Sequence, residues 1–215
     1  DDFVVEQKFY TSKDGTRVPM FLVRSKAVAE SGKAVPTLLY GYGGFNISLT
    51  PGFSPSRLAW VESGGAYVVA NIRGGGEFGP RWHKAALKTN RQRAYDDFIA
   101  VAEDLTKRGI TSPKRLGISG GSNGGLLVGA IFTQRPDLMN AVVCRVPLLD
   151  MMRYTKLLAG ASWAAEYGDP DNPDDWAFIS KYSPYQALKK SADYPAPFFY
   201  LSTEDDRVHP GHARK

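Results

Sequence analysis

A glycine-rich run around one serine most constrains how this chain folds. Residues 120–125 read Gly-Gly-Ser-Asn-Gly-Gly, and they lie between a predicted strand (Arg115–Ser119) and a predicted helix from Leu126 onward. A serine with glycines two positions before and after it is typical of a sharp strand-to-helix turn, because glycine lets the two elements approach without Cβ clashes. The pattern predicts that Ser122 projects its hydroxyl at the carboxyl edge of a parallel sheet.

The same turn offers hydrogen-bond donors for a negative charge that forms beside the serine. The first turn of a helix has unpaired N–H groups, so the backbone N–H of Asn123 can donate to an oxyanion there. Ser122 is therefore the candidate nucleophile. The alternative is a glycine-rich turn without chemistry, because short motifs recur by chance.

Length and composition predict one soluble globular domain. The chain has 215 residues, of which 43% are hydrophobic and 23% charged, and no internal boundary stands out. Its 27 Lys and Arg against 22 Asp and Glu give a charge of +5, but the basic residues are scattered, which argues against a nucleic-acid partner. No apolar stretch approaches the roughly 18 residues that a membrane helix needs, and no signal-peptide order is present. We expect no membrane contact and a cytoplasmic location, with periplasmic export as the alternative.

The single cysteine and the histidines bear on redox and metal chemistry. Cys144 ends the apolar run Ala141–Cys144, which predicts a buried, unreactive thiol and no internal disulfide. No group of His, Cys and carboxylate residues has the spacing of metal ligands, so no metal is expected.

Apolar runs bounded by turn residues predict a mixed sheet and one long amphipathic helix. The helix covers Arg91–Arg108, where apolar residues recur on one face. The first two strands flank a hairpin-type turn at Ser12–Thr16, and later strands alternate with helices. This order predicts an α/β fold with a mostly parallel sheet and helices on both faces. The strands are expected at Val4–Tyr10, Val18–Arg24, Thr37–Tyr42, Ala66–Ile72, Leu116–Ser119, Ala141–Val146 and Phe198–Ser202.

A serine nucleophile on such a turn needs an acid and then a histidine later in the chain. Asp205 and Asp206 come directly after the strand that ends at Ser202, so either carboxylate could face an imidazole beside Ser122. Asp150, after the preceding strand, is the competitor. Each of the three could instead be a solvated loop charge or a turn cap.

The histidine is harder to assign. His209 and His212 follow Asp205 so closely that little chain is left to present a ring to both the acid and the serine. His83 precedes the serine and is expected to pack locally. We therefore expect the catalytic histidine to lie beyond Lys215, and the chain to be a fragment that is incomplete at its C-terminus.

A second glycine-rich segment, Gly74–Gly79, matches G-x-G-x-x-G after a predicted strand. A dinucleotide site also needs an acidic residue about 20 positions later at the tip of a second strand. Asp96 and Asp97 fall inside the predicted long helix instead. We expect no dinucleotide cofactor.

Four blocks taken together resemble the prolyl oligopeptidase family of serine peptidases: Tyr40–Asn46, Asn71–Gly79, Gly120–Gly125 and Asp205–Val208. The resemblance runs from about Phe3 to the end. It implies an α/β-hydrolase fold over residues 1–215, no cofactor, and a monomeric serine endopeptidase that cleaves short peptides on the carboxyl side of proline. The alternatives are a dipeptidyl-peptidase, an acylaminoacyl-peptidase or a carboxylesterase on the same fold, or a non-catalytic fragment that lacks its base.

The resemblance also implies roles for individual residues. Ser122 corresponds to the nucleophile and Asp205 to the acid of the triad. The oxyanion donors correspond to the backbone N–H of Asn123 and the hydroxyl of Tyr42. Family members also carry a β-propeller and a histidine a few tens of residues after the acid, and neither is present here, so we expect residues 1–215 alone to be inactive.

The residues implied in substrate binding are mostly aromatic. Trp163 corresponds to the ring that stacks on the substrate proline, Phe45 and Tyr167 to further walls of that pocket, and Arg207 to a donor for a substrate carbonyl. A flat indole suits a rigid pyrrolidine ring, and a guanidinium holds a carbonyl with good geometry. Without the resemblance, Trp163 and Tyr167 would be interpreted as core aromatics.

Overall fold

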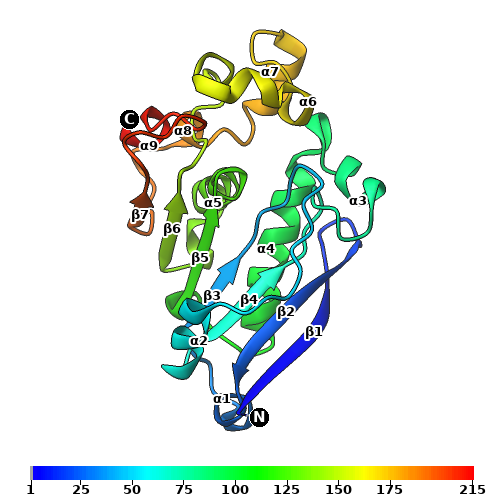
Figure 1. The fold of residues 1–215 in the computed structure, drawn as a ribbon, viewed down its shortest axis with the longest axis vertical. Helices are drawn as coiled ribbons and strands as arrows, with labels where there is room; N and C mark the ends of the chain where they lie inside the picture. The colour runs from blue at the N-terminus through cyan, green and yellow to red at the C-terminus, as the bar shows by residue number, and fades with distance from the viewer. Residues whose placement is uncertain (1) are drawn as a thin grey trace.

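The computed structural model describes residues 2–215, which form one seven-stranded sheet flanked by helices (Figure 1). The strand order across the sheet is β1-β2-β4-β3-β5-β6-β7. The strands are β1 (Phe3–Thr11), β2 (Arg17–Ser25), β3 (Thr37–Tyr40), β4 (Ala66–Ala70), β5 (Leu116–Gly121), β6 (Ala141–Arg145) and β7 (Pro197–Tyr200). All the predicted strands are confirmed, with shifts of one or two residues at their ends.

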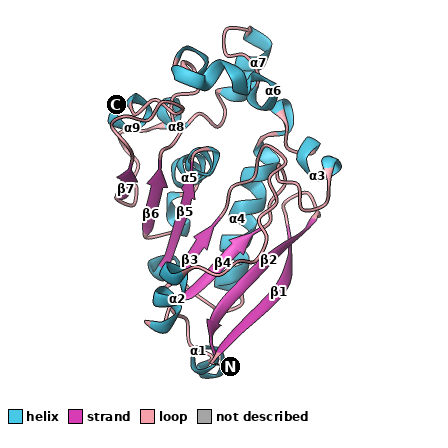
Figure 2. Cartoon of the chain, in the orientation of Figure 1, coloured by secondary structure: helices cyan, strands magenta, loops and turns pink. Residues whose placement is uncertain are grey.

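The pairing of the strands brings five carboxyl ends to one edge of the sheet. β1 and β2 form an antiparallel hairpin, and β2 pairs antiparallel with β4. The pairs β4–β3, β3–β5, β5–β6 and β6–β7 are all parallel. Figure 2 shows that β3 to β7 point towards the end of the molecule that carries α6 and α7. A ligand site is expected at that edge, because loops after parallel strands converge there.

Helices lie on both faces of the sheet, as predicted. α4 and α5 pack on the face of Leu39 and Val68, whereas α2 packs on the opposite face, where its Arg57 lies 5.0 Å above the ring of Tyr67. The helices are α1 (Lys26–Ser31), α2 (Pro55–Glu62), α3 (Pro80–Lys84), α4 (Gln92–Lys107), α5 (Asn123–Gln134), α6 (Ala164–Tyr167), α7 (Pro173–Ile179), α8 (Pro184–Ala187) and α9 (Gly211–Arg214).

The core lies mainly between the sheet and the helices α4 and α5. The buried stripe of α4 includes Tyr95, Phe98 and Leu105, at the helical spacing that the sequence predicts. Residues 123–132 of α5 are all buried. An apolar helix of this kind is expected in a core rather than at a surface. The turn at Ser122 that precedes α5 is therefore attached to a helix that is buried along residues 123–132.

The end of β3 differs from the prediction, whereas the burial of Cys144 agrees with it. β3 ends at Tyr40 rather than Tyr42, because the chain turns through Gly43, whose φ is +67°. Cys144 is buried, as predicted, and its burial raises the pKa of the thiol to about 12. Such a thiol carries no reactive thiolate near neutral pH.

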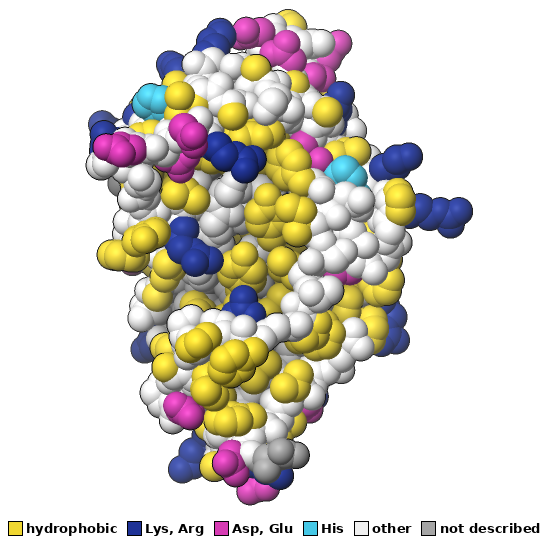
Figure 3. All heavy atoms as spheres, viewed as in Figure 1, with side chains coloured by type: hydrophobic (Ala, Val, Ile, Leu, Met, Phe, Trp, Pro, Cys, Tyr) yellow, Lys and Arg dark blue, Asp and Glu magenta, His cyan; other side chains and the backbone are white. Residues whose placement is uncertain are grey.

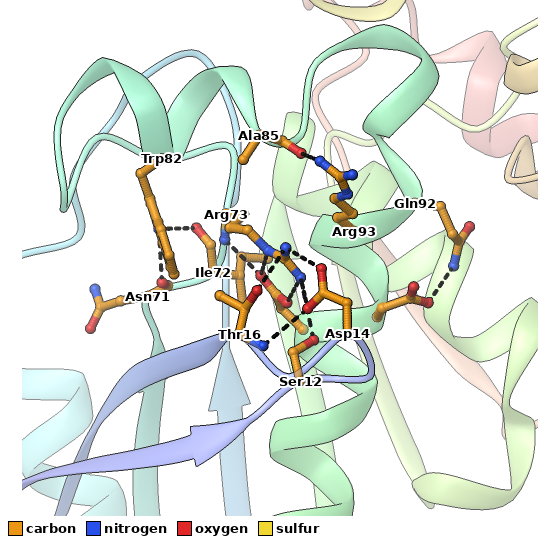
Figure 4. A network of polar contacts seen from close by, with 12 residues as sticks. Ser12, Asp14, Thr16, Asn71, Ile72, Arg73, Trp82, Ala85, Gln92 and Arg93 are labelled. Atoms are coloured by element: carbon orange, nitrogen blue, oxygen red, sulfur yellow. Dashed lines mark hydrogen bonds and ion pairs between the residues drawn. The ribbon is translucent and has the colours of Figure 1, made fainter.

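The second glycine-rich segment follows a buried ionic network centred on Arg73 (Figure 4). The guanidinium of Arg73 donates to both oxygens of Asp97 at 2.7 and 3.0 Å and to Asp14 at 2.6 Å. Arg73 is 4% exposed and Asp97 is fully buried, so each charge is compensated by its partner. The network ties the hairpin turn, the loop after β4 and helix α4 together, and it explains Asp97 as a structural partner inside a helix.

The loop after Arg73 supports the loop after β3. The carbonyl of Gly74 accepts a hydrogen bond from Asn46 N at 3.2 Å. A Cβ on Gly74 would lie 2.4 Å from the carbonyl oxygen of Gly43. Only glycine permits this approach, so the glycines of this segment serve loop packing here.

The surface is hollowed on the face seen in Figure 3, where hydrophobic side chains gather with Lys and Arg side chains beside them. Phe53, Phe198 and Tyr200 are the more exposed aromatics of the described chain, at 82%, 63% and 61%. Within residues 2–215, no helix is long and apolar enough to cross a membrane.

Candidate active site

Ser122 occupies a backbone conformation that side-chain-bearing residues rarely adopt. Its φ is 57° and its ψ is −117°. A non-glycine residue in such a region costs on the order of 1–3 kcal/mol and persists only where its surroundings impose it. Here Ser122 N donates to Arg145 O at 2.9 Å, and Ser122 O accepts from Gly125 N and Leu126 N at 2.9 and 3.1 Å. The turn is thus fixed on both sides, and the hydroxyl makes no hydrogen bond to any residue in the described part of the chain.

The glycines around Ser122 are required by close backbone contacts. A Cβ on Gly120 would lie 2.2 Å from the carbonyl oxygen of Gly124, and one on Gly124 would lie 2.8 Å from that of Gly41. A Cβ on Gly125 would lie 2.7 Å from Pro147 Cα. Backbone atoms cannot move away as a flexible side chain can. The motif is therefore a geometric requirement of the strand-to-helix turn.

We expect Gly120→Ala to destabilise the protein by about 3 kcal/mol, because the new methyl group overlaps the backbone of α5. The matched control is Gly117→Ala in the same strand, where the nearest atom to a new Cβ is 3.6 Å away. Thermal unfolding measures both. Equal midpoints for the two variants would contradict the close contact at Gly120.

The two candidate oxyanion donors, Asn123 N–H and the Tyr42 hydroxyl, belong to segments that are joined by a hydrogen bond. Asn123 is the first residue of α5, and its side-chain Nδ2 donates to Tyr42 O at 2.7 Å. Burial raises the pKa of Tyr42, so the phenol keeps its proton and can donate it in a hydrogen bond. The hydroxyl of Tyr42 makes no hydrogen bond within residues 2–215.

Asp205 lies in the loop after β7, two strands from the strand that leads to Ser122. Its Oδ1 accepts from Arg207 N and Val208 N, both at 2.9 Å. These bonds close the turn and leave Oδ2 without a partner in the described residues. Neighbouring strands are about 4.8 Å apart, so the ends of β5 and β7 are separated by about 10 Å at one edge. The exposed Asp206 makes no hydrogen bond within residues 2–215.

Asp150, the competing acid, is fully buried, and both of its carboxylate oxygens accept hydrogen bonds. Burial would raise its pKa, but hydrogen bonds from Lys215, Gln186 and Arg153 hold the pKa at about 2. Gln186 donates to Oδ1 at 2.8 Å, while Arg153 and Lys215 donate to Oδ2. This geometry favours a structural role for Asp150 and leaves Asp205 as the better candidate.

Each histidine of the chain has another partner. His212 Nδ1 accepts from Leu149 N and Asp150 N, both at 3.1 Å, and burial lowers its pKa to about 4. His209 Nδ1 accepts from Gly211 N at 2.9 Å. His83 Nε2 lies 2.7 Å from Glu166 Oε2. Within residues 2–215, none of the three hydrogen-bonds to Ser122 or Asp205.

The aromatic residues expected at the substrate pocket do not all face solvent. Phe45 and Trp163 are partly buried and present some surface. Tyr167, predicted as a further wall, is fully buried, because it packs edge-on against Phe45 at 5.7 Å and donates to Asn123 Oδ1 at 2.7 Å. Tyr167 therefore contacts Phe45 and Asn123 from the protein interior and lines no open surface.

Arg207 is exposed, and its guanidinium makes no ion pair within residues 2–215. Its backbone carbonyl accepts from Ala159 N at 3.3 Å. This bond joins the loop of Asp205 to the 3₁₀ segment Leu158–Trp163 that ends at Trp163. Arg207 thus has free side-chain donors, within the described residues, on a loop that is joined to the segment of Trp163.

Two buried charges at this site were not predicted from the sequence. Glu166 accepts hydrogen bonds from Phe45 N and Arg91 Nη1, and Arg91 Nη2 donates to Asn123 Oδ1 at 2.5 Å. Both residues are almost fully buried. The sequence offers one signal: Glu166 lies between Trp163 and Tyr167. A charged residue between aromatic residues is either exposed or, where it is buried, paired with another group.

Comparisons with known proteins bear on this arrangement. The prolyl oligopeptidase family matches residues 51–215. The chain belongs to the prolyl oligopeptidase family. A prolyl endopeptidase of Elizabethkingia meningoseptica is 48% identical over an alignment of 216 positions, which covers 100% of this chain and 30% of that protein. An uncharacterized peptidase of Sinorhizobium fredii is 60% identical over 212 residues, which are 98% of this chain and 29% of that protein.

Solved structures agree with the fold. A post-proline cleaving enzyme from Rickettsia typhi superposes with a TM-score of 0.96 at 51% identity, over 99% of this chain and 31% of that one. The fold is therefore the α/β-hydrolase fold of this family, as the sequence predicts. The chain spans about 30% of the length of the relatives it matches.

Proposed function

We propose that the protein is a serine endopeptidase that hydrolyses short peptides on the carboxyl side of proline. The single observation that supports this most is the strained turn at Ser122, on the same sheet edge as the loop of Asp205, in a chain of the prolyl oligopeptidase family. A hydroxyl without another partner at that edge is available to attack a substrate carbonyl.

In the proposed mechanism, Ser122 Oγ attacks the carbonyl carbon of the proline residue while a histidine removes its proton. That histidine comes from outside residues 1–215, because each of the three present has another partner. Asp205 orients the imidazole and stabilises its charged form. The tetrahedral oxyanion accepts hydrogen bonds from Asn123 N–H and from the Tyr42 hydroxyl.

Collapse of the tetrahedral intermediate expels the leaving amine, which takes the proton from the imidazolium. Water then attacks the acyl-enzyme while the histidine removes a proton from the water. The second tetrahedral intermediate collapses, the acid product leaves, and the histidine returns the proton to Ser122 Oγ. Trp163 and Phe45 hold the proline ring, and Arg207 donates to a carbonyl one residue upstream. No step needs a metal or an organic cofactor.

Substrate profiling of the full-length protein tests this proposal. Peptides blocked at both ends should be cleaved after an internal proline, with kcat/KM about 100-fold above the alanine analogue, because a shaped apolar pocket discriminates missing methylenes by roughly 10–200-fold. Cleavage that required a free N-terminus two residues before the scissile bond would indicate a dipeptidyl-peptidase instead. Hydrolysis of simple esters without peptide cleavage would indicate a carboxylesterase.

A further inference from the structure

Glu166 joins three segments of the site from a buried position. Its Oε1 accepts from Phe45 N at 2.8 Å and from Arg91 Nη1 at 3.2 Å, and its Oε2 lies 2.7 Å from His83 Nε2. The residue is 4% exposed. A buried carboxylate is tolerated only where hydrogen bonds and an opposite charge compensate it, and these contacts supply that compensation.

The bond to Phe45 acts on a strained loop. Phe45 and Asn46 both have positive φ, 55° and 58°, although neither is glycine. Two consecutive residues of this kind hold their conformation only where neighbouring groups impose it. Glu166 supplies the acceptor for the first N–H, and Gly74 O supplies the acceptor for the second at 3.2 Å.

The position of Glu166 in the sequence links this loop to the element that follows Trp163. Glu166 lies on α6, three residues after Trp163 and one before Tyr167. Its side chain therefore connects the element that carries Trp163 to the backbone of Phe45. The rings of Phe45 and Tyr167 also contact each other edge-on, with their centres 5.7 Å apart and their planes at 84°.

Arg91 carries the connection on to the nucleophile turn. The guanidinium is 1% exposed, donates to Glu166 and to Asn123 Oδ1, and lies 5.2 Å from the centre of the Tyr167 ring. Asn123 in turn donates to Tyr42 O. A single buried ion pair thus contacts the backbone of the Phe45 loop and the side chain of the residue after Ser122.

We propose that Glu166 is a positioning residue that fixes the separation of Phe45 and Trp163 and thereby sets the preference for proline at the cleavage site. This inference rests on the proposed function. Glu166 does not touch the reacting atoms; it acts through the Phe45 backbone and through Arg91. Loss of its side chain frees the strained loop and leaves Arg91 buried without its charged partner.

The test compares Glu166→Ala and Glu166→Gln in the full-length protein, with the fraction of active sites measured by titration with a fluorophosphonate. The matched control is Glu103→Gln on α4, an acid that pairs with Arg135 at 2.8 Å on the surface. For Glu166→Ala we expect the ratio of kcat/KM for proline over alanine substrates to fall about tenfold, mainly through KM. Glu166→Gln keeps an oxygen for Phe45 N, so its ratio should fall about threefold. The control should leave the ratio unchanged.

A purely structural role would lower the active fraction and leave the proline-to-alanine ratio of the remaining sites intact, and that result would overturn the proposal. If Glu166→Ala does not fold, the Glu166→Gln ratio decides in the same way. Hydrogen exchange supplies a readout that is independent of activity. The amide of Phe45 should exchange at least tenfold faster in Glu166→Ala than in the unmodified protein. In Glu166→Gln the increase should be smaller.

The exchange experiment also separates the two proposals. If the unmodified protein cleaved neither substrate, the proposed function and the specificity role of Glu166 would both be wrong. Faster exchange at Phe45 would then still establish that Glu166 holds the loop. Unchanged exchange in both variants would contradict that as well.

Discussion

Replacing Ser122 by alanine in the full-length protein is expected to lower kcat for a proline substrate about 10⁶-fold, because the members of a catalytic triad act as a unit. KM should change little, since the hydroxyl has no partner in the described residues and its removal disturbs no packing. The backbone bonds from Ser122 N to Arg145 O and from Gly125 N to Ser122 O do not involve the side chain. Steady-state kinetics on the two proteins measures the effect.

The matched control is Ser63→Ala. Ser63 is an exposed serine at the end of α2. Within residues 2–215, its hydroxyl bonds only to carbonyls of its own helix, Ala59 O and Trp60 O. Its kcat should stay within about twofold of the unmodified protein, as surface substitutions usually do. A Ser122→Ala protein that retained more than a hundredth of the activity would remove Ser122 from the mechanism.

Asp205→Asn is expected to lower kcat about 10⁴-fold, because an amide cannot stabilise the imidazolium and favours the wrong tautomer of the histidine. Asparagine keeps an oxygen that can accept from Arg207 N and Val208 N, so the turn after β7 should persist. The loss should therefore appear in kcat and not in the thermal unfolding midpoint. Kinetics and thermal unfolding of the same sample measure both.

Asp206→Asn is the control for that substitution, because Asp206 is the neighbouring residue and is exposed. Its kcat should change by about twofold or less. If Asp206→Asn caused the larger loss, the acid of the triad would be Asp206. If neither had an effect and Asp150→Asn did, the buried carboxylate beside Lys215 would be the acid, contrary to our interpretation of its network.

The sharp strand-to-helix turn could be predicted from the sequence, because its close backbone contacts require glycine at fixed positions. Gly120 and Gly124 identify the turn at Ser122, and the contacts that a Cβ would make there explain why no other residue fits. The strands were predictable for a similar reason, since apolar runs between turn residues are typical of a buried sheet. The ends were less certain, as the early end of β3 at Tyr40 illustrates.

The buried charges of the site could not be predicted from the sequence. Arg91 and Glu166 are 75 positions apart and meet through the fold, and no local pattern distinguishes them from surface residues of the same type. The burial of Tyr167 has the same cause: its partners Phe45 and Asn123 come from distant loops. Long-range polar contacts depend on the packed structure, whereas strand and turn signals are local.

The strained backbone at Ser122 also has a physical role. The turn places the hydroxyl at the edge of the sheet, and the turn is anchored by α5, which follows it and is buried along residues 123–132. The cost of on the order of 1–3 kcal/mol is offset by the packing of that helix. In the proposed mechanism, a hydroxyl held in this position needs little rearrangement when substrate binds.

The measurement that tests the central claim most directly is the position of a covalent adduct. The full-length protein is treated with a fluorophosphonate and digested, and the modified residue is identified by mass spectrometry. We expect one phosphonylated serine, Ser122, with labelling abolished in Ser122→Ala and strongly slowed in Asp205→Asn. An adduct on any other residue, or labelling that persists in Ser122→Ala, would contradict this expectation.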